Sequence, residues 1–348
     1  MAGFKNILLF VDSNTLCEEA CERAIALAAE ENARLTILNV IEAVPERLGS
    51  PADQTSKDLR EIGILERCEK LKELVVTNQA NLQFEINVVC GNPVAEVMQQ
   101  VLRGRHDLVI VAEHSRSPLK QISLGSATLK LIRKCACPVW VINPSIAKED
   151  IRIMAAVDPD PFDKDRDALN TKILDIASSL TVREGTELHI VNAWRAPAEG
   201  VLRSQGGLSA ENLSRYAYNV FNVQASSIKE MIQNSSATTV RHRMHLMKGT
   251  ASKVIPMVAR RAKIDLLVVG MFSRRGLGGW FIGNTAEKIL NQVKCSVLMV
   301  KPNGAVGLAR KPSHSDIEKI AIIDGSSTDK DKGFPEIDTV PKRGTYNE

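Results

Sequence analysis

Residues 106–144 read HDLVIVAEHSRSPLKQISLGSATLKLIRKCACPVWVINP, and residues 264–302 read IDLLVVGMFSRRGLGGWFIGNTAEKILNQVKCSVLMVKP. The two stretches align without a gap at a constant spacing of 158 residues, which places Gly283 opposite Gly125. Self-similarity at a fixed spacing indicates a duplicated structural unit. The sequence therefore predicts two copies of one domain.

The segments in front of this repeat also match, at shorter spacings. ILLFVDSN, which contains Asp12, aligns with IMAAVDPD, which contains Asp158, at a spacing of 146 residues. LTILNVIE and LHIVNAWR align next, with Val40 opposite Val191 at a spacing of 151 residues. Because the spacing grows from 146 to 158, the second copy carries 12 extra residues, placed before its third strand.

Each copy alternates short apolar runs with stretches of helical periodicity. A continuous apolar run such as residues 6–12 is typical of a parallel strand buried on both faces. Strict alternation of strand and helix predicts an α/β fold, with two tandem doubly wound domains that each contain a five-stranded parallel sheet. The strands are expected at residues 6–12, 35–41, 84–90, 107–112 and 138–143 of the first copy, and at 153–158, 188–193, 241–247, 265–270 and 296–300 of the second.

These runs set the expected domain boundaries at residues 1–147 and 148–304. Residues 305–348 are rich in Gly, Pro, Ser and charged residues, so most of this tail is expected to be disordered. Within the tail, residues 319–327 read KIAIIDGSS, much like the first strand and its aspartate. Two interpretations stay open: a short docked segment, or a vestigial third repeat that adds a strand to a sheet edge.

Two further expectations concern the second copy. Residues 181–186 are expected to form a surface loop at the Gly185 break, before a buried strand at residues 188–193. Residues 196–225 hold the insertion, and apolar residues recur there and beyond at helical spacing. This helix either packs on the sheet or forms a lid suited to an apolar, lipid-like ligand. Its apolar face consists of Leu213, Ala217, Val220, Phe221, Ile228 and Ile232.

Composition excludes several classes of protein. The net charge of +4 over 348 residues is spread without a basic block, and aromatic residues make up only 4%, which argues against nucleic-acid binding. No apolar run approaches the roughly 20 residues that span a bilayer, and the first residues are typical of a strand rather than a signal peptide. The seven cysteines lack metal-ligand spacing, which predicts reduced thiols, no metal site and a cytoplasmic location.

The carboxyl ends of the strands are where a doubly wound sheet binds its ligand. In the second copy these ends include Asp158, Val191 and the loop GMFSRRGLGGWFIGNTAEKI, which starts at Gly270. Glycines let a backbone approach a phosphate closely, and Arg274 adds positive charge. Asn284 then opens a helix whose free amides favour an anion. The alternative is a flexible connection that ends in a helix N-cap at Asn284.

The two copies resemble tandem universal stress protein domains over residues 4–144 and 151–302, and they look most like the E-type tandem members of bacteria. The nucleotide motif of that family is G-x-x-G, nine residues, then G-[S/T]. In the second copy the motif positions hold Gly270, Ser273, Gly283 and Asn284. In the first copy they hold Ala112, Ser115, Gly125 and Ser126.

The resemblance implies a Rossmann-like fold of the adenine-nucleotide alpha hydrolase kind, and ATP with Mg as the ligand. It implies these candidate residues in the second copy: Asp158, Pro159, Val191, Gly270, Ser273, Arg274, Gly283, Asn284 and Thr285. The degraded counterparts in the first copy are Asp12, Val40, Ala112, Ser115, Gly125 and Ser126. Because the first copy lacks both glycines of the first motif pair, nucleotide binding is expected in the second copy rather than in the first.

The sequence contains no catalytic constellation: no G-x-S-x-G elbow, no H-E-x-x-H and no Walker lysine. We therefore expect a non-enzymatic protein, slow ATP hydrolysis aside. One hypothesis is a nucleotide-responsive binding module. The other is a scaffold that no longer binds ATP and acts through a protein partner or an apolar ligand. Family members pair through their last strands, so PVWVI and SVLMV are expected to pair within this chain as an internal pseudo-dimer, with a homodimer of the whole chain left open.

Overall fold

The computed structural model divides into two compact units, and each unit has its own strands and helices. The amino-terminal unit comprises residues 4–112, 135–137 and 309–348, and the carboxy-terminal unit comprises residues 1–3, 113–134 and 138–308, as far as these are described. The described residues are 3–12, 17–41, 54–78, 82–112, 125–144, 150–160, 162–204, 209–271, 283–302 and 319–324. Among them, no helix is both long enough and apolar enough to cross a membrane.

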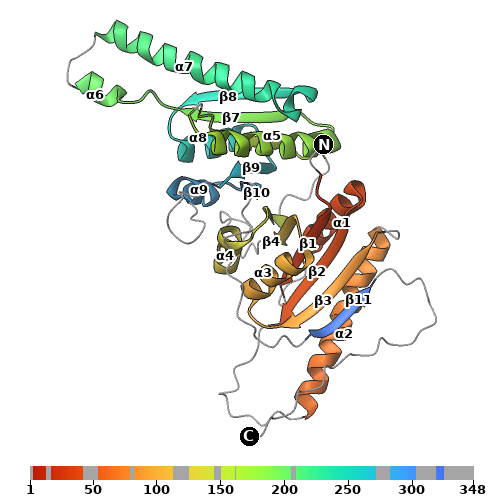
Figure 1. The fold of residues 1–348 in the computed structure, drawn as a ribbon. Coiled ribbons are helices and arrows are strands. Elements are labelled where there is room, and N and C mark those ends of the chain that lie inside the picture. The colour runs from red at the N-terminus through yellow and green to blue at the C-terminus, as the bar shows by residue number, and fades with distance from the viewer. Residues whose placement is uncertain are drawn as a thin grey trace, which may run out of the picture. The chain divides into compact units, whose positions relative to one another are not determined.

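Four parallel strands form the centre of the amino-terminal unit (Figure 1). Their spatial order, β3-β2-β1-β4, reverses beside β1, which is the topological switch point of a doubly wound sheet. The strands are β1 (Asn6–Asp12), β2 (Arg34–Ile41), β3 (Phe84–Cys90) and β4 (Leu108–Ala112). The helices are α1 (Glu18–Glu31), α2 (Gln54–Asn78) and α3 (Pro93–Gly104). The α/β alternation predicted from the sequence is confirmed.

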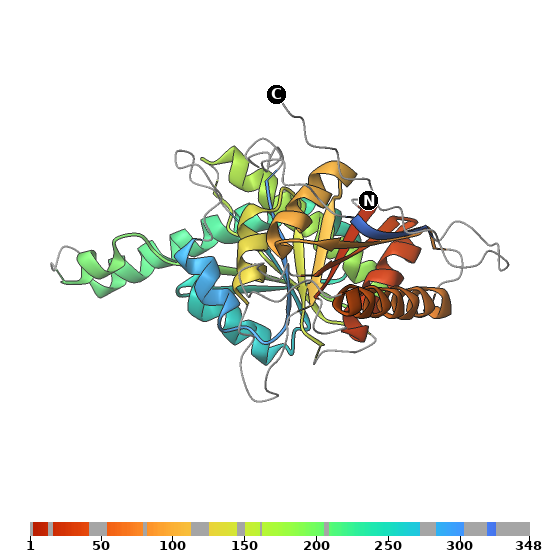
Figure 2. The ribbon, with the colours of Figure 1, turned by 90° about the horizontal axis from the view of Figure 1, so that it is seen from below.

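The tail segment KIAIID forms β11 (Lys319–Asp324), which adds to β3 in antiparallel orientation. Figures 1 and 2 show this blue strand beside β3. Ile322 pairs with Asn87 and Asp324 pairs with Glu85. The interpretation of the tail as an added edge strand is therefore confirmed, and β11 covers backbone groups of β3 that a bare edge would leave unpaired.

The carboxy-terminal unit repeats the parallel order as β10-β9-β6-β7-β8. Helices α5 and α7 pack against each other, as do α8 and α9, and right-handed crossovers place these pairs on opposite faces of the sheet. The strands are β5 (Val139–Ile142), β6 (Ile153–Ala156), β7 (Leu188–Trp194), β8 (His242–Lys248), β9 (Leu266–Gly270) and β10 (Ser296–Val300). The helices are α4 (Ser126–Lys134), α5 (Lys164–Glu184), α6 (Glu199–Ser204), α7 (Ala210–Gln233), α8 (Ala251–Arg261) and α9 (Asn284–Leu290).

The last strands of the two copies, β5 and β10, pair with each other in antiparallel orientation. Trp140 lies opposite Leu298, and both are buried. Asn143 fixes the end of β5, because its backbone NH donates to Ser296 Oγ at 3.1 Å and its side chain donates to Lys294 O at 2.6 Å. The expectation that the two last strands pair within the chain is confirmed.

The surface loop expected at residues 181–186 is wrong for most of its length. Helix α5 continues to Glu184 and ends at Gly185, which adopts a left-handed conformation with φ 64°. Thr181 is only 1% exposed, and its hydroxyl donates to Ala177 O at 2.7 Å. A threonine within a helix can donate its hydroxyl hydrogen bond to a carbonyl of the preceding turn, so the Thr181 side chain can be buried without another polar partner. The buried strand expected next is confirmed as β7, whose first five residues are buried.

The pairing of Val40 with Val191 across the two copies is also wrong, by two residues. In the first copy Phe10 lies opposite Leu38, and in the second Ala156, which aligns with Phe10, lies opposite Val191. Val191 therefore corresponds to Leu38, at a spacing of 153 residues. Val40 corresponds to Ala193, and the same spacing matches Asn39 with Asn192.

The insertion forms α6 and α7, and α7 packs against α5. Of the predicted apolar face, Leu213, Ile228 and Ile232 are buried, whereas Ala217, Val220 and Phe221 are half-buried. Phe221 contacts Trp194 of β7 at a ring distance of 5.7 Å. The described helix is thus a packed element whose middle part is only partly covered.

Candidate functional site

The predicted ligand site lies where the parallel strands of the carboxy-terminal unit end. Asp158 and Pro159 follow β6, and Val191 lies in the neighbouring β7. Gly270 is the last residue of β9, and Gly283 directly precedes α9. The sheet thereby brings the strand-end candidates to its carboxyl edge, where doubly wound sheets bind ligands.

Several predicted residues fall elsewhere. Ser273, Arg274 and Ser115 lie outside the described residues. In the amino-terminal unit, Asp12 ends β1 and Ala112 ends β4. The remaining first-copy candidates are Val40, which lies buried in β2, and Gly125 and Ser126, which stand at the start of α4 and belong to the carboxy-terminal unit.

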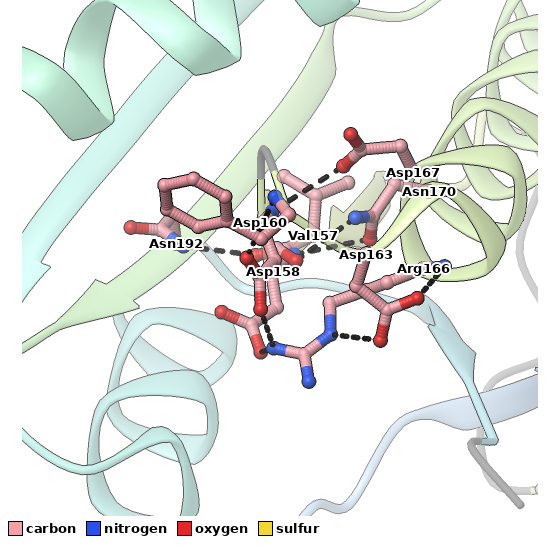
Figure 3. A network of polar contacts seen from close by, with 9 residues as sticks. Val157, Asp158, Asp160, Asp163, Arg166, Asp167, Asn170 and Asn192 are labelled. Atoms are coloured by element: carbon pink, nitrogen blue, oxygen red, sulfur yellow. Dashed lines mark hydrogen bonds and ion pairs between the residues drawn. The ribbon is translucent and has the colours of Figure 1, made fainter.

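The carboxylate of Asp158 is held by Arg166 of α5, as Figure 3 shows. Arg166 Nη1 lies 3.2 Å from Asp158 Oδ2 and 3.4 Å from Asp160 Oδ2. Its Nε lies 3.7 Å from Asp163 Oδ2. Asp163 in turn caps α5, since its side chain accepts a hydrogen bond from the backbone NH of Arg166 at 3.1 Å. One guanidinium therefore positions three carboxylates at the end of β6.

Two asparagines fix the backbone on either side of Asp158 (Figure 3). Asn170 accepts from the Asp158 NH at 3.1 Å and donates to the Asp158 carbonyl at 2.9 Å. Asn192 of β7 donates to the Val157 carbonyl at 3.0 Å. Asn170 and Asn192 are almost fully buried, so these bonds are shielded from water. The backbone at the end of β6 is thus held before any ligand arrives.

Asp158 itself stays open to solvent, with 73% of its side chain exposed. The protein that surrounds it raises the pKa of its carboxyl group by desolvation, and the Arg166 guanidinium partly opposes this shift. An exposed carboxylate whose backbone is fixed can accept hydrogen bonds from a sugar hydroxyl or coordinate a cation.

No sequence motif indicated Arg166 or Asn170, because both reach Asp158 from α5, whose position over the strand end is a property of the fold. Asn192 did carry a signal. The aligned segments LTILNVIE and LHIVNAWR share an asparagine, Asn39 or Asn192, inside an otherwise apolar strand. Asn39 is buried too and donates to the Val11 carbonyl at 3.0 Å, so both copies use the same bond.

Close packing against α5 explains the glycine at position 270, independently of any nucleotide. A Cβ at this position would lie 2.8 Å from Leu169 Cδ2 and 2.9 Å from Ile173 Cδ1 of α5. The glycine therefore lets α5 approach the end of β9. Ala112 occupies the matching position of the first copy.

Replacing Gly270 with alanine should lower the free energy of unfolding by about 1 kcal/mol, because the side chains of Leu169 and Ile173 must shift to admit a methyl group. Urea unfolding of the full chain measures the change. Gly185→Ala is no matched control, because Gly185 has φ 64°. Gly283→Ala is the control, since a Cβ there meets no atom of the described residues within 4 Å. An unchanged free energy of unfolding for Gly270→Ala would show that Leu169 and Ile173 of α5 can accommodate a methyl group without cost.

Gly283 and the residues after it have an open backbone. Gly283, rather than Asn284 as expected, is the N-cap of α9, with φ −60° and ψ 150°, and as a glycine it has no side chain that could cap the helix. Asn284 and Thr285 form the first turn and are exposed. The first amides of a helix have no partner within it, so these groups are available to another acceptor.

The pKa values of three buried cysteines, one in the carboxy-terminal unit and two in the amino-terminal unit, argue against reactive thiols at these positions. Burial raises the pKa of the Cys295 thiol to about 12. In the amino-terminal unit, burial raises the pKa of Cys21 to about 12 and that of Cys68 to about 11. Thiols with such pKa values remain protonated and act as small apolar side chains.

Comparison with known proteins decides the family. The family model described as "Universal stress protein family" matches residues 3–143 and 152–301. The chain belongs to the universal stress protein family. Universal stress protein E of Photorhabdus laumondii is 26% identical over 310 residues, which cover 87% of this chain and 97% of that protein. Universal stress protein E of Escherichia coli K12 is 27% identical over 312 residues, which cover 87% and 96%.

Solved structures agree on the fold. A Pseudomonas aeruginosa PAO1 protein of unknown function shares 22% identity at a TM-score of 0.60, over 87% of this chain and 95% of that one. A universal stress protein from Archaeoglobus fulgidus shares 16% identity at a TM-score of 0.59, over 84% and 98%. The chain is therefore a tandem universal stress protein, and its relatives link it to the stress response.

Proposed function

We propose that this universal stress protein acts by binding a ligand rather than by catalysis, and that the carboxy-terminal unit binds a nucleotide, ATP with Mg. The observation that carries the proposal is Asp158, an exposed carboxylate at the carboxyl edge whose backbone is fixed by Asn170 and Asn192. The residues present fit a ribose hydroxyl or a cation at Asp158.

The polyphosphate would lie on the amides at Gly283, Asn284 and Thr285. This assignment is supported by the lack of a side chain cap on α9 and by the open space beside Gly283. Three carboxylates share one guanidinium at the end of β6, so a polyphosphate would need its own cation there. Mg would supply that positive charge. The chain itself binds and orients the nucleotide.

Gly283→Ala should weaken Mg-ATP binding about tenfold, which is about 1.4 kcal/mol. The substitution adds a methyl where backbone must approach phosphate, yet among the described residues it meets no atom within 4 Å, so we expect the fold to tolerate it. Calorimetric titration of Mg-ATP into the full chain measures the change.

The matched control is Gly125→Ala, the same residue in the first copy, which should leave Mg-ATP binding unchanged. A wild-type protein that gives no heat with millimolar Mg-ATP would end the nucleotide proposal. An equal loss of Mg-ATP affinity in both variants would contradict the assignment of the nucleotide to the second copy alone.

A second candidate function is a scaffold that binds a protein partner or an apolar ligand. The insertion favours it, because it exposes Val201 of α6 and Tyr218 and Val223 of α7, at 52%, 63% and 58%. Mass spectrometry of small molecules released from the purified protein distinguishes the candidates: a bound nucleotide supports the first and a bound lipid supports the second. We further propose a cytoplasmic location, supported by the free thiols of Cys17, Cys21, Cys68 and Cys295.

A further inference from the structure

A cavity of about 760 Å³ lies in the carboxy-terminal unit, at the opposite edge of the sheet from Asp158. Residues at the amino ends of three strands line it: Arg152 directly precedes β6, Glu187 directly precedes β7, and Arg243 is the second residue of β8. Lys263, just after α8, closes it. The volume suits a small-molecule ligand.

The lining of this cavity, which we call the basic cavity, carries a surplus of positive charge. Its charged residues are Arg152, Arg243, Arg261 and Lys263 against Asp150 and Glu187. Glu187 is engaged by Arg243, whose Nε lies 3.1 Å from Glu187 Oε2. Within the described part of the chain, the side chains of Arg261 and Lys263 form no ion pair, so two cations face the space uncompensated.

Two histidines form the wall of the basic cavity on the sheet. His189 Nδ1 and His245 Nε2 lie 2.9 Å apart, with the rings stacked at an interplanar angle of 5°. A hydrogen bond at this distance needs a proton on only one of the two facing nitrogens. Burial lowers the pKa of both histidines, and Arg243 lowers both further, while Glu187 opposes the shift. His189 is also disfavoured as a cation by His245 and Arg152. These effects together favour the neutral form of both rings.

The fold does not require these residues. The first copy has Thr36 where the second has His189, and Asn87 where the second has His245. It has Glu85, an acid, where the second has Arg243. The same doubly wound sheet thus forms without a histidine pair and without a cation at the place of Arg243, although Arg103 and Arg105 stand where the second copy has Arg261 and Lys263. Their combination in one cavity of the second copy points to a ligand rather than to packing.

We propose that the basic cavity binds a small oxyanion with at least two negative charges, and that binding draws one proton onto the His189–His245 pair. Arginine offers planar donors that match phosphate and carboxylate oxygens, and Lys263 adds a point charge. Burial is the main cause that lowers the pKa of both histidines, and Arg243 adds to it; a bound anion would oppose both effects by favouring the charged ring. A second proton is not expected, since both facing nitrogens would then carry hydrogen and the bond between them would break.

The test uses sulfate, whose own charge is constant near neutral pH, and the histidine ring signals of the full chain in NMR spectra. We expect the signals of His189 and His245 to shift with millimolar sulfate, and those of His242 to stay in place. Affinity should rise from about pH 8 to about pH 6 by up to about a hundredfold, because uptake of one proton on binding changes affinity about tenfold per pH unit.

The decisive variants are Arg261→Gln and Arg260→Gln. Both remove one charge from the last turn of α8, but only Arg261 lines the basic cavity. Arg261→Gln should weaken sulfate about tenfold, and Arg260→Gln should not. Equal losses, or no shift of the two rings at any sulfate concentration up to about 100 mM, would overturn the proposal.

Titrations with pyrophosphate and citrate then separate the two sources of such an anion. Tighter pyrophosphate assigns the basic cavity to phosphate compounds, and tighter citrate assigns it to polycarboxylates. The proposal stands apart from the nucleotide site, because Gly283→Ala should leave the sulfate response unchanged.

Discussion

Replacing Leu298 with alanine should lower the free energy of unfolding by about 2–5 kcal/mol. Leu298 lies at the centre of β10 with none of its surface exposed, and it sits directly opposite Trp140 of β5. The substitution removes buried apolar surface and leaves a cavity in the middle of the pairing between the last strands.

Urea unfolding measures the loss, and peptide-level hydrogen exchange shows where it falls. Exchange should accelerate in Val139–Ile142 as well as in β10, because the two strands share their hydrogen bonds. Met299→Leu is the control, since it keeps the volume at a neighbouring buried position and should cost less than about 1.5 kcal/mol. A loss below about 1 kcal/mol for Leu298→Ala, or exchange confined to β10, would contradict this account of the pairing.

Most of the fold could be predicted because buried parallel strands are continuous apolar runs, and because the duplication repeats them. The uniform apolar character of these strands also limits the prediction, because it leaves the alignment of one copy with the other poorly defined. A strand such as LHIVNAW has few marked positions, so sliding it by two residues costs the alignment little. This is how Val191 came to be matched with Val40 instead of Leu38. The asparagine that the two strands share, Asn39 and Asn192, marks the correct spacing of 153 residues. The backbone pairing, which sets each residue's opposite neighbour, confirms it.

The end of α5 shows a second limit. Thr181 and Val182 are weak helix formers and stand before a glycine, which favours a loop on local grounds. The helix continues because one side of it is buried, and Thr181 at 1% exposure belongs to that side. Tertiary packing thus overrides propensity for one more turn, until Gly185 adopts a left-handed conformation that ends the helix.

Only part of the candidate site could be predicted from the sequence. The strand ends that carry Asp158 follow from the parallel order alone, as does their position at the carboxyl edge. Arg166 and Asn170 could not be predicted, because their roles depend on how α5 turns back over β6. The motif glycine at position 270 stays a ligand candidate, and the structure adds a packing reason for it, because a Cβ there would meet side chains of α5.

Asn192→Ala should lower the free energy of unfolding by about 1–3 kcal/mol and should also weaken Mg-ATP binding. Asn192 is 2% exposed, and its amide donates to the Val157 carbonyl at 3.0 Å. Alanine leaves that carbonyl buried without this donor, which accounts for the loss of stability. Because Val157 directly precedes Asp158, the carboxylate loses part of its positioning, and a ligand must then order it on binding.

The matched control for this last prediction is Asn39→Ala. Asn39 is as buried as Asn192 and makes the same bond, to the Val11 carbonyl at 3.0 Å. The two variants should therefore lose similar stability in urea unfolding, while only Asn192→Ala changes the calorimetric titration with Mg-ATP. If both variants bound Mg-ATP like the wild type, Asn192 would be a structural residue alone, and the fixed backbone at Asp158 would have no part in ligand binding. If Asn39→Ala alone weakened binding, the nucleotide would belong to the first copy, whose degraded motif would then have to be reinterpreted around Asp12.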